Sequence, residues 1–237
     1  MATQTVGSLY LIPIPISEGK ANTLPDEVIQ KIHSLRYFVA ENARTARRFI
    51  SSTNPPYALP DVSVEQFGKH DDIEPATILK PVMDGHDIGV MSEAGCPGIA
   101  DPGARLAGWC HRHGIRVIPM TGPSSLILAL MASGLNGQKF TFHGYLPRDK
   151  KELAHALKSL ERESANDKGA QLWIEAPYRN RAMIEALFSS LNTSTRVTIA
   201  SDITGDAEFI RTAKAGEWPK IQLPDMHKVP AVFILQA

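Results

Sequence analysis

Short runs of apolar, often β-branched residues alternate along the first half of the chain with segments in which apolar residues recur every three to four positions. The runs predict strands at residues 8–14, 37–40, 88–91 and 116–120, and the periodic segments predict helices at residues 25–35, 43–51, 73–83 and 103–113. Because two parallel strands need a crossover connection, which is usually a helix, this order predicts an α/β fold with mostly parallel pairing.

The second half of the chain has more strands at closer spacing. Strands are predicted at residues 139–143, 171–174, 195–200 and 229–236, and helices at residues 124–133, 149–163 and 179–191. Trp218-Pro219 and Leu223-Pro224 interrupt the segment 205–228, which is therefore predicted to be irregular. Closely spaced strands favour a mixed sheet. We expect two α/β domains with mixed, mostly parallel sheets, one over residues 1–117 and one over residues 118–237.

Composition narrows the class of protein. The 237 residues include 43% hydrophobic residues, and 25 Lys and Arg balance 25 Asp and Glu. These proportions are typical of a globular protein, and the zero formal charge argues against nucleic-acid binding through bulk charge, although a local basic patch stays open. Two cysteines, Cys96 and Cys110, are too few for a disulfide framework or a four-thiolate zinc site. We expect no metal site.

The sequence shows no recognisable targeting signal. The first residues lack a basic region, and Pro13 and Pro15 interrupt a short apolar stretch, so no signal peptide is predicted. No apolar run approaches the roughly 18 residues that a membrane-spanning helix needs. We therefore expect a cytoplasmic protein that does not bind a membrane.

Three loops at predicted strand ends carry the candidate chemistry. The stretch VMSEAGCPGIADPG, residues 90–103, follows an apolar strand and precedes a helix, and the same is true of PMTGPSS, residues 119–125. Ligands of open α/β sheets bind at such carboxyl ends. The spacing matches neither the dinucleotide fingerprint nor a P-loop. Together with IPIPI at residues 12–16, these loops favour an organic ligand held largely by backbone groups, the alternative being tight connections that bind nothing.

The same stretches carry a family resemblance. SEAGCPGIADPG and TGPSSLILALMASGL resemble the tetrapyrrole methylase superfamily, and within it the ribosomal RNA small subunit methyltransferase I family. Four further segments match in order: LYLIPIPI at residues 9–16, AENARTARR at 40–48, FTFHGYLP at 140–147 and WIEAPYR at 173–179. Six ordered segments are far more specific than any single one.

The resemblance implies an S-adenosyl-L-methionine-dependent methyltransferase that acts on a ribose 2′-hydroxyl of small-subunit ribosomal RNA. It also implies a homodimer and two α/β domains with the cofactor in the cleft between them. Carried over by motif, the cofactor contacts are Pro13, Ser92, Glu93, Ala94, Gly95, Ile99, Ala100, Asp101, Pro123, Ser124, Ser125, Phe142, His143, Gly144, Ala176 and Pro177.

The sequence departs from the family pattern on the substrate side. Glu41-Asn42-Ala43-Arg44 stands where members usually read EDTR, and Gly205 stands where they carry a lysine. We expect a short form without the C-terminal extension of full-length members. The departures leave two alternatives open: a small-molecule, tetrapyrrole-type methylase of the same fold, or a cofactor-binding protein that has lost catalysis.

Methyl transfer to a ribose needs alignment of the reactants, exclusion of water and a base for the hydroxyl proton. Glu93, His143 and Glu175 are the predicted catalytic residues and Glu41 is a further candidate, while a bracing role is the alternative for each. Basic side chains that could hold an RNA backbone, or else form solvated surfaces, are Arg44, Arg47, Arg48, Arg148, Lys150, Lys151 and Arg179.

Overall fold

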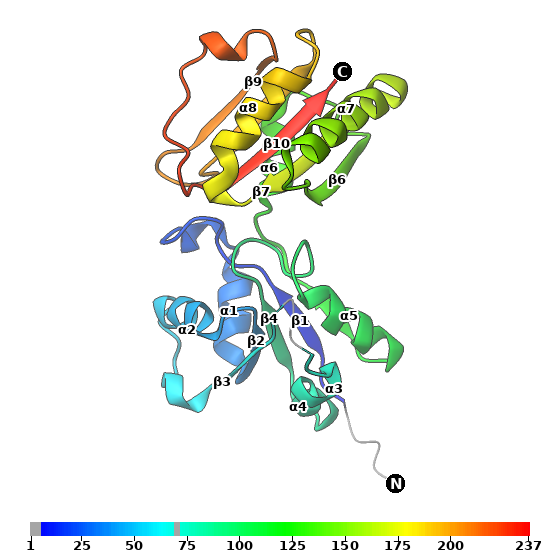
Figure 1. Ribbon diagram of the computed structural model, residues 1–237. Helices are drawn as coiled ribbons and strands as arrows, with labels where there is room; N and C mark the ends of the chain where they lie inside the picture. The colour runs from blue at the N-terminus through cyan, green and yellow to red at the C-terminus, as the bar shows by residue number, and fades with distance from the viewer. Residues whose placement is uncertain (1–5, 69–71) are drawn as a thin grey trace. The chain divides into compact units, whose positions relative to one another are not determined.

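The structure, a computed structural model, describes residues 6–68 and 72–237 of the chain. It forms two compact units, Met1–Ser124 and Ser125–Ala237 (Figure 1). The units divide later in the chain than the predicted boundary at residues 117 and 118. The reason is strand β5 (Val117–Pro119), which pairs with β1 (Leu9–Ile12) and so belongs to the sheet of the first unit.

The first unit contains one parallel five-stranded sheet in the order β3-β2-β4-β1-β5. Its elements are β1, η1 (a 3₁₀ turn, Ala21–Thr23), α1 (Asp26–Ser34), β2 (Tyr37–Ala40), α2 (Ala43–Ser52), η2 (Leu59–Asp61), β3 (Ser63–Gln66), α3 (Pro75–Ile78), α4 (Lys80–Met83), β4 (Ile88–Met91), α5 (Gly103–Arg112) and β5. All-parallel sheets are covered on both faces, and β4 is accordingly buried along its whole length.

Two apolar clusters cover the two faces of this sheet. Val28 and Ile32 of α1 and Ile50 of α2 pack with Phe38 on one face. Leu106, on α5, belongs to a second cluster with buried residues of α3 and α4. Figure 1 shows α1 and α2 on one side of the strands and α5 on the other. The loop after β1 therefore leads to one face and the loop after β4 to the opposite face.

The second unit contains a mixed five-stranded sheet in the order β6-β7-β10-β8-β9. Its elements are α6 (Ser125–Ser133), β6 (Phe140–Tyr145), α7 (Lys150–Asp167), β7 (Ala170–Glu175), η3 (Pro177–Arg179), α8 (Asn180–Ser190), β8 (Arg196–Ser201), β9 (Phe209–Lys214), η4 (Trp218–Lys220) and β10 (Ala231–Gln236). Strands β6 and β7 are parallel, and the pairs β7–β10, β10–β8 and β8–β9 are antiparallel. The predicted mixed sheet is confirmed.

Helices α7 and α8 lie across one face of this sheet in Figure 1. Leu157 of α7 and Leu187 of α8 are fully buried against Trp173 and Phe233 of the central strands. The rings of Trp173 and Phe233 stack with their centroids 5.9 Å apart. Large aromatic side chains bury more apolar area than any others, so this pair anchors the core of the second unit.

Three sequence predictions differ from the structure. The helix predicted at residues 73–83 is two short helices, α3 and α4, because Leu79 between them leaves the helical conformation with ψ 10° just before the Lys80-Pro81 start of α4. Strand β3 was not predicted, and β9 forms within the segment 205–228 that was predicted to be irregular. Both are edge strands of their sheets, which is why they carry few buried residues.

Candidate functional site

The loops after β1 and β4 are tied together at the carboxyl edge of the first sheet. Ile14 donates its backbone N–H to the carbonyl of Gly95 at 3.0 Å, and Gly95 donates its own N–H back to Ile14 at 3.1 Å. The two loops lead to opposite faces of the sheet, and a place where neighbouring strands diverge in this way is where open α/β sheets bind ligands. The predicted location of the site thus has the topology that ligand binding requires.

The loop after β5 joins the same group. A Cβ atom at Gly122 would lie 2.2 Å from Cβ of Pro13, so no larger residue fits between the two loops. The thiol of Cys96 points to two carbonyls of this loop, at 3.4 Å from that of Pro123 and 3.7 Å from that of Gly122. Pro13, Gly95 and Pro123, three of the predicted cofactor contacts, therefore lie in loops that touch one another.

The loop after β4 is braced by its own side chains. Ser92 is buried, and its hydroxyl donates to the carbonyls of Ala94 and Gly95 at 3.1 Å each. Asp101 accepts the backbone N–H groups of Gly98 and Gly103 on one carboxylate oxygen. Burial raises the pKa of Asp101 above its usual range, and the two N–H groups oppose that rise. Ser92 and Asp101 thus fix the loop from within.

Other residues of this loop face outward. Glu93, Ala94, Ile99 and Ala100 are exposed, with 48% of Ile99 accessible. Ala100 adopts φ 60°, a conformation that a non-glycine residue adopts only when its surroundings impose it. A stiff loop that presents an exposed isoleucine and an exposed carboxylate suits a ligand with both apolar and hydrogen-bonding parts.

A cavity of about 350 Å³ lies beside this loop within the first unit. Its lining comes from the loop after β1, from α2 and from the loop after β4: Ile14, Pro15, Ile16, Ser17, Glu18, Gly19, Thr45, Arg48, Phe49, Ser52 and Glu93. Of these, Glu93 and Arg48 were predicted as site residues, and Ile14, Pro15 and Ile16 lie in the predicted ligand loop at residues 12–16. The signal for Thr45, Phe49 and Ser52 was their spacing with Arg48, which places them on one face of a helix.

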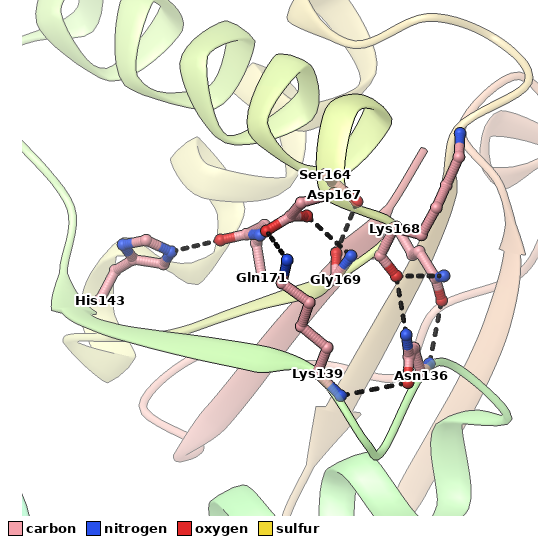
Figure 2. Close-up of polar contacts among 9 residues, drawn as sticks. Asn136, Lys139, His143, Ser164, Asp167, Lys168, Gly169 and Gln171 are labelled. Atoms are coloured by element: carbon pink, nitrogen blue, oxygen red, sulfur yellow. Dashed lines mark hydrogen bonds and ion pairs between the residues drawn. The ribbon is translucent and has the colours of Figure 1, made fainter.

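In the second unit, His143 on β6 is held by Gln171 on β7. Nε2 of His143 lies 2.7 Å from Oε1 of Gln171, whose side chain is buried (Figure 2). Because Oε1 can only accept, Nε2 donates in this contact, and a neutral ring then offers Nδ1 as its acceptor nitrogen. Figure 2 shows Nδ1 turned away from Gln171. The β6–β7 register shifts between Phe142 and Tyr145, and Gly144 has φ 68°, so a bulge sets the direction of this segment.

Glu175 ends β7 in a buried position. One carboxylate oxygen accepts the backbone N–H of Ala176 at 2.7 Å, and the other lies 3.4 Å from Nη2 of Arg179. The same Nη2 donates to the carbonyl of Pro147 at 3.3 Å. Arg179 is thus engaged inside its unit and 14% exposed at its side chain, unlike the other predicted RNA-binding residues. Pro177 begins η3, the 3₁₀ turn that ends with Arg179.

The basic residues form one group in each unit. Arg44, Arg47 and Arg48 are exposed on α2, where Arg48 pairs with Glu18 at 3.3 Å and Arg47 donates to the carbonyl of Val64. Arg148, Lys150 and Lys151 are exposed around the start of α7, which Asp149 caps by accepting the N–H groups of Lys151 and Glu152. Ser124 ends the first unit and Ser125 begins α6.

The loops of the first unit fit the cofactor that the resemblance implies. S-adenosyl-L-methionine combines an adenine, a ribose and a charged amino acid. The donor set offered here is backbone groups of braced loops, the exposed apolar surface of Ile99 and the carboxylate of Glu93. Among the described residues, no group of three or more His, Cys, Asp or Glu side chains is arranged to hold a metal ion. No helix within residues 6–68 and 72–237 is long and apolar enough to cross a membrane.

Comparison with known proteins shows close relatives over nearly the whole chain. No protein-family model matches it. The ribosomal RNA small subunit methyltransferase I of Escherichia coli O157:H7 is 30% identical over 219 residues, 91% of this chain and 72% of the relative. The protein of the same name from Synechocystis sp. (strain ATCC 27184 / PCC 6803 / Kazusa) is 29% identical over 84% of this chain and 68% of its own length.

Two solved structures share the fold. The methyltransferase CobJ aligns with a TM-score of 0.64 at 15% identity, over 97% of this chain and 94% of its own. The uroporphyrin-III-C-methyltransferase from Thermus thermophilus aligns with a TM-score of 0.54 at 16% identity, over 97% and 92%. The expected α/β architecture of two such domains is confirmed.

Proposed function

We propose that this chain, which belongs to the ribosomal RNA small subunit methyltransferase I family, methylates a ribose 2′-hydroxyl of small-subunit ribosomal RNA. It is a methyltransferase, and S-adenosyl-L-methionine is the methyl donor. The main support for an RNA substrate is that the chain is 30% identical over 219 residues to a protein named as a ribosomal RNA methyltransferase. The exposed arginines of α2 support it, because they supply a local basic surface to a chain of zero formal charge.

We propose that the loops at the carboxyl edge of the first sheet bind the donor. In the first unit, the exposed residues Glu93, Ala94 and Ala100 would face the polar parts of the donor, and Ile99 would cover an apolar part. When bound, the donor supplies a methyl group that is already electrophilic, because the bond electrons stay on its sulfur. The residues of the chain therefore orient the two reactants and exclude water.

The ribose hydroxyl must lose its proton as its oxygen accepts the methyl group, and a side chain has to take that proton. His143 offers Nδ1, since Gln171 holds the hydrogen on Nε2. Glu93 offers an exposed carboxylate on the rim of a cavity. Glu175 is paired with Arg179, so bracing suits it better than proton transfer. We propose that the base is Glu93 or His143.

The activity is tested with small ribosomal subunits that lack 2′-O-methylation, incubated with the purified chain and methyl-labelled donor. We expect label in the ribosomal RNA, at a nucleoside that digestion and mass spectrometry identify as 2′-O-methylated. Free ribosomal RNA and large subunits serve as controls. Label found only on a tetrapyrrole would favour the small-molecule methylase, and donor binding without transfer to any of these would favour a protein that has lost catalysis.

Two further proposals concern the protein's surroundings. We propose that the chain forms a homodimer and works in the cytoplasm, where ribosomal subunits are available. Light scattering coupled to gel filtration tests the first, with an expected mass of twice the 25.9 kDa of one chain. Fluorescence microscopy of the tagged protein in its own cells tests the second, and a membrane-bound or exported signal would contradict it.

A further inference from the structure

The cavity beside the loop after β4 is lined mainly by residues that are not among the predicted donor contacts. Thr45, Arg48 and Ser52 line it from one face of α2, and Glu93 lines it from a separate loop. Ile16 and Phe49 supply apolar surface to the same lining. A guanidinium, two hydroxyls, a carboxylate and an aromatic ring together match the parts of a nucleotide, namely its phosphate, its sugar hydroxyls and its base.

Its volume matches as well. At about 350 Å³, the cavity falls in the range of roughly 300–1,000 Å³ in which small-molecule sites are found, toward the lower end. Sequence-specific RNA recognition usually takes single, unstacked nucleotides whose bases stack on aromatic side chains. A cavity of this size therefore suits one nucleotide of a longer strand.

Glu18 pairs with the guanidinium of Arg48, the group of this cavity that would bind a phosphate. Its Oε1 lies 3.3 Å from Nη2 of Arg48, and the side chains are 79% and 67% exposed. A carboxylate and a phosphate present the same type of charged oxygen to a guanidinium. An exposed ion pair of this kind contributes little to stability, so an incoming phosphate can displace Glu18 at low cost.

We infer that this cavity binds the target nucleotide of the RNA, with Arg48 on a phosphate of that nucleotide and Glu18 as the internal anion that the phosphate displaces. The inference rests on the proposed RNA substrate and names the part of the first unit that receives it. Glu93 then lies in the same lining as the nucleotide, which places one of the two proposed bases beside the sugar.

The test compares Arg48→Gln and Glu18→Gln with two matched controls. Arg112→Gln and Glu27→Gln make the same charge changes at exposed positions of helices in the same unit, and neither residue lines the cavity. RNA affinity is measured by fluorescence anisotropy with a labelled fragment of small-subunit ribosomal RNA at 50 to 200 mM salt, and donor affinity by calorimetry.

We expect Arg48→Gln to weaken RNA binding about tenfold and to lower the salt slope of log K by about one, because one phosphate contact is lost. Glu18→Gln should tighten RNA binding by about two- to fivefold, since no internal anion competes. Both variants should keep the donor affinity of the wild type, and the two controls should change RNA affinity less than about twofold.

Three results would overturn the inference. An Arg48→Gln variant with intact RNA affinity and weakened donor binding would assign the cavity to the charged end of the donor. Unchanged or weaker RNA binding in Glu18→Gln would remove Glu18 as the displaced anion. Equal losses of RNA affinity in Arg48→Gln and Arg112→Gln would show that RNA responds to the overall charge of the protein and not to Arg48 in particular. If the proposed function itself were wrong, the wild type would transfer no methyl group to RNA, and this result distinguishes that case from the three above.

Discussion

Gly122 is the residue on which the contact between the loops after β1 and β5 depends. Its missing side chain leaves room for Pro13, and a Cβ atom would lie 2.2 Å from the proline ring. We expect Gly122→Ala to lower the free energy of unfolding by about 1–3 kcal/mol, as overpacking does, and to weaken donor binding at least tenfold. Thermal denaturation and calorimetry measure the two effects.

The matched control for that prediction is Gly137→Ala. Gly137 has open space where a Cβ would stand, and its backbone is not in the left-handed region. This variant should keep both stability and donor affinity. If Gly122→Ala bound the donor as the wild type does, the contact between the two loops would have no part in donor binding.

Two substitutions of Asp101 separate its role as a hydrogen-bond acceptor from its role as a negative charge. Asp101→Asn keeps an oxygen that accepts the N–H groups of Gly98 and Gly103, whereas Asp101→Ala leaves both without that acceptor. We expect Asp101→Ala to lose about 1–3 kcal/mol of stability and most donor affinity, and Asp101→Asn to lose little of either. Equal losses in the two variants would mean that the charge itself is required.

The pH dependence of the same residue has a defined sign. Burial raises the pKa of Asp101 above 3.8, so the folded state binds its proton more tightly than the unfolded state does. The stability of the wild type relative to Asp101→Asn should therefore be highest below pH 3.8 and fall as the pH rises through the higher folded value. Urea denaturation at pH values on both sides of this window measures it.

At the scale of elements, β6 and β7 are joined by the pair of His143 and Gln171. If Nδ1 of His143 takes the substrate proton, Gln171 acts as a positioning residue that sets the tautomer. Gln171→Glu should move the acidic limb of the pH–rate profile to higher pH, because a carboxylate stabilises the protonated ring. Gln171→Leu should lower kcat with little change in KM for the donor. A profile that shifts in neither variant would leave Glu93 as the base.

Most elements could be predicted from the sequence because their apolar residues recur at the period of the element they form. Strands β3 and β9, each at an edge of its sheet, are the exceptions, whereas the edge strands β5 and β6 were predicted. Val64 is the one buried residue of β3, and β9 has none, because an edge strand has only one neighbour and its burial is incomplete. No clear apolar run marks these two strands, and each is held in its sheet by pairing with one neighbour, β2 or β8.

The residues of the candidate site could likewise be predicted from the sequence only in part. Glycine and proline mark the loops, so Gly95 and Pro123 could be located from the sequence, because few other residues adopt or stiffen such turns. What the sequence could not supply is which side chains turn inward. Ser92 and Asp101 brace their own loop, Arg179 is engaged by Glu175, and Thr45 and Phe49 line a cavity beside Glu93. These roles depend on contacts between segments, and local patterns do not encode them.

For the whole molecule, the two units have separate cores. Phe233 and Trp173 belong to the cluster of the second unit, whereas Phe38 belongs to a cluster made only of residues from the first. Because the clusters share no residue, a packing defect in one core should loosen that unit alone. We expect Phe233→Leu and Phe38→Leu each to cost about 1–3 kcal/mol, with opposite patterns of local unfolding.

Hydrogen exchange read by mass spectrometry measures those patterns peptide by peptide. In Phe233→Leu, amides of β7, β8 and β10 should exchange faster while those of β1, β2 and β4 keep wild-type protection, and Phe38→Leu should show the reverse. Each variant is thereby the control for the other, since both make the same substitution at a fully buried ring. Faster exchange in all six strands of both variants would show that the units unfold as one cooperative block, and the stability of a donor loop in the first unit would then depend on packing in the second.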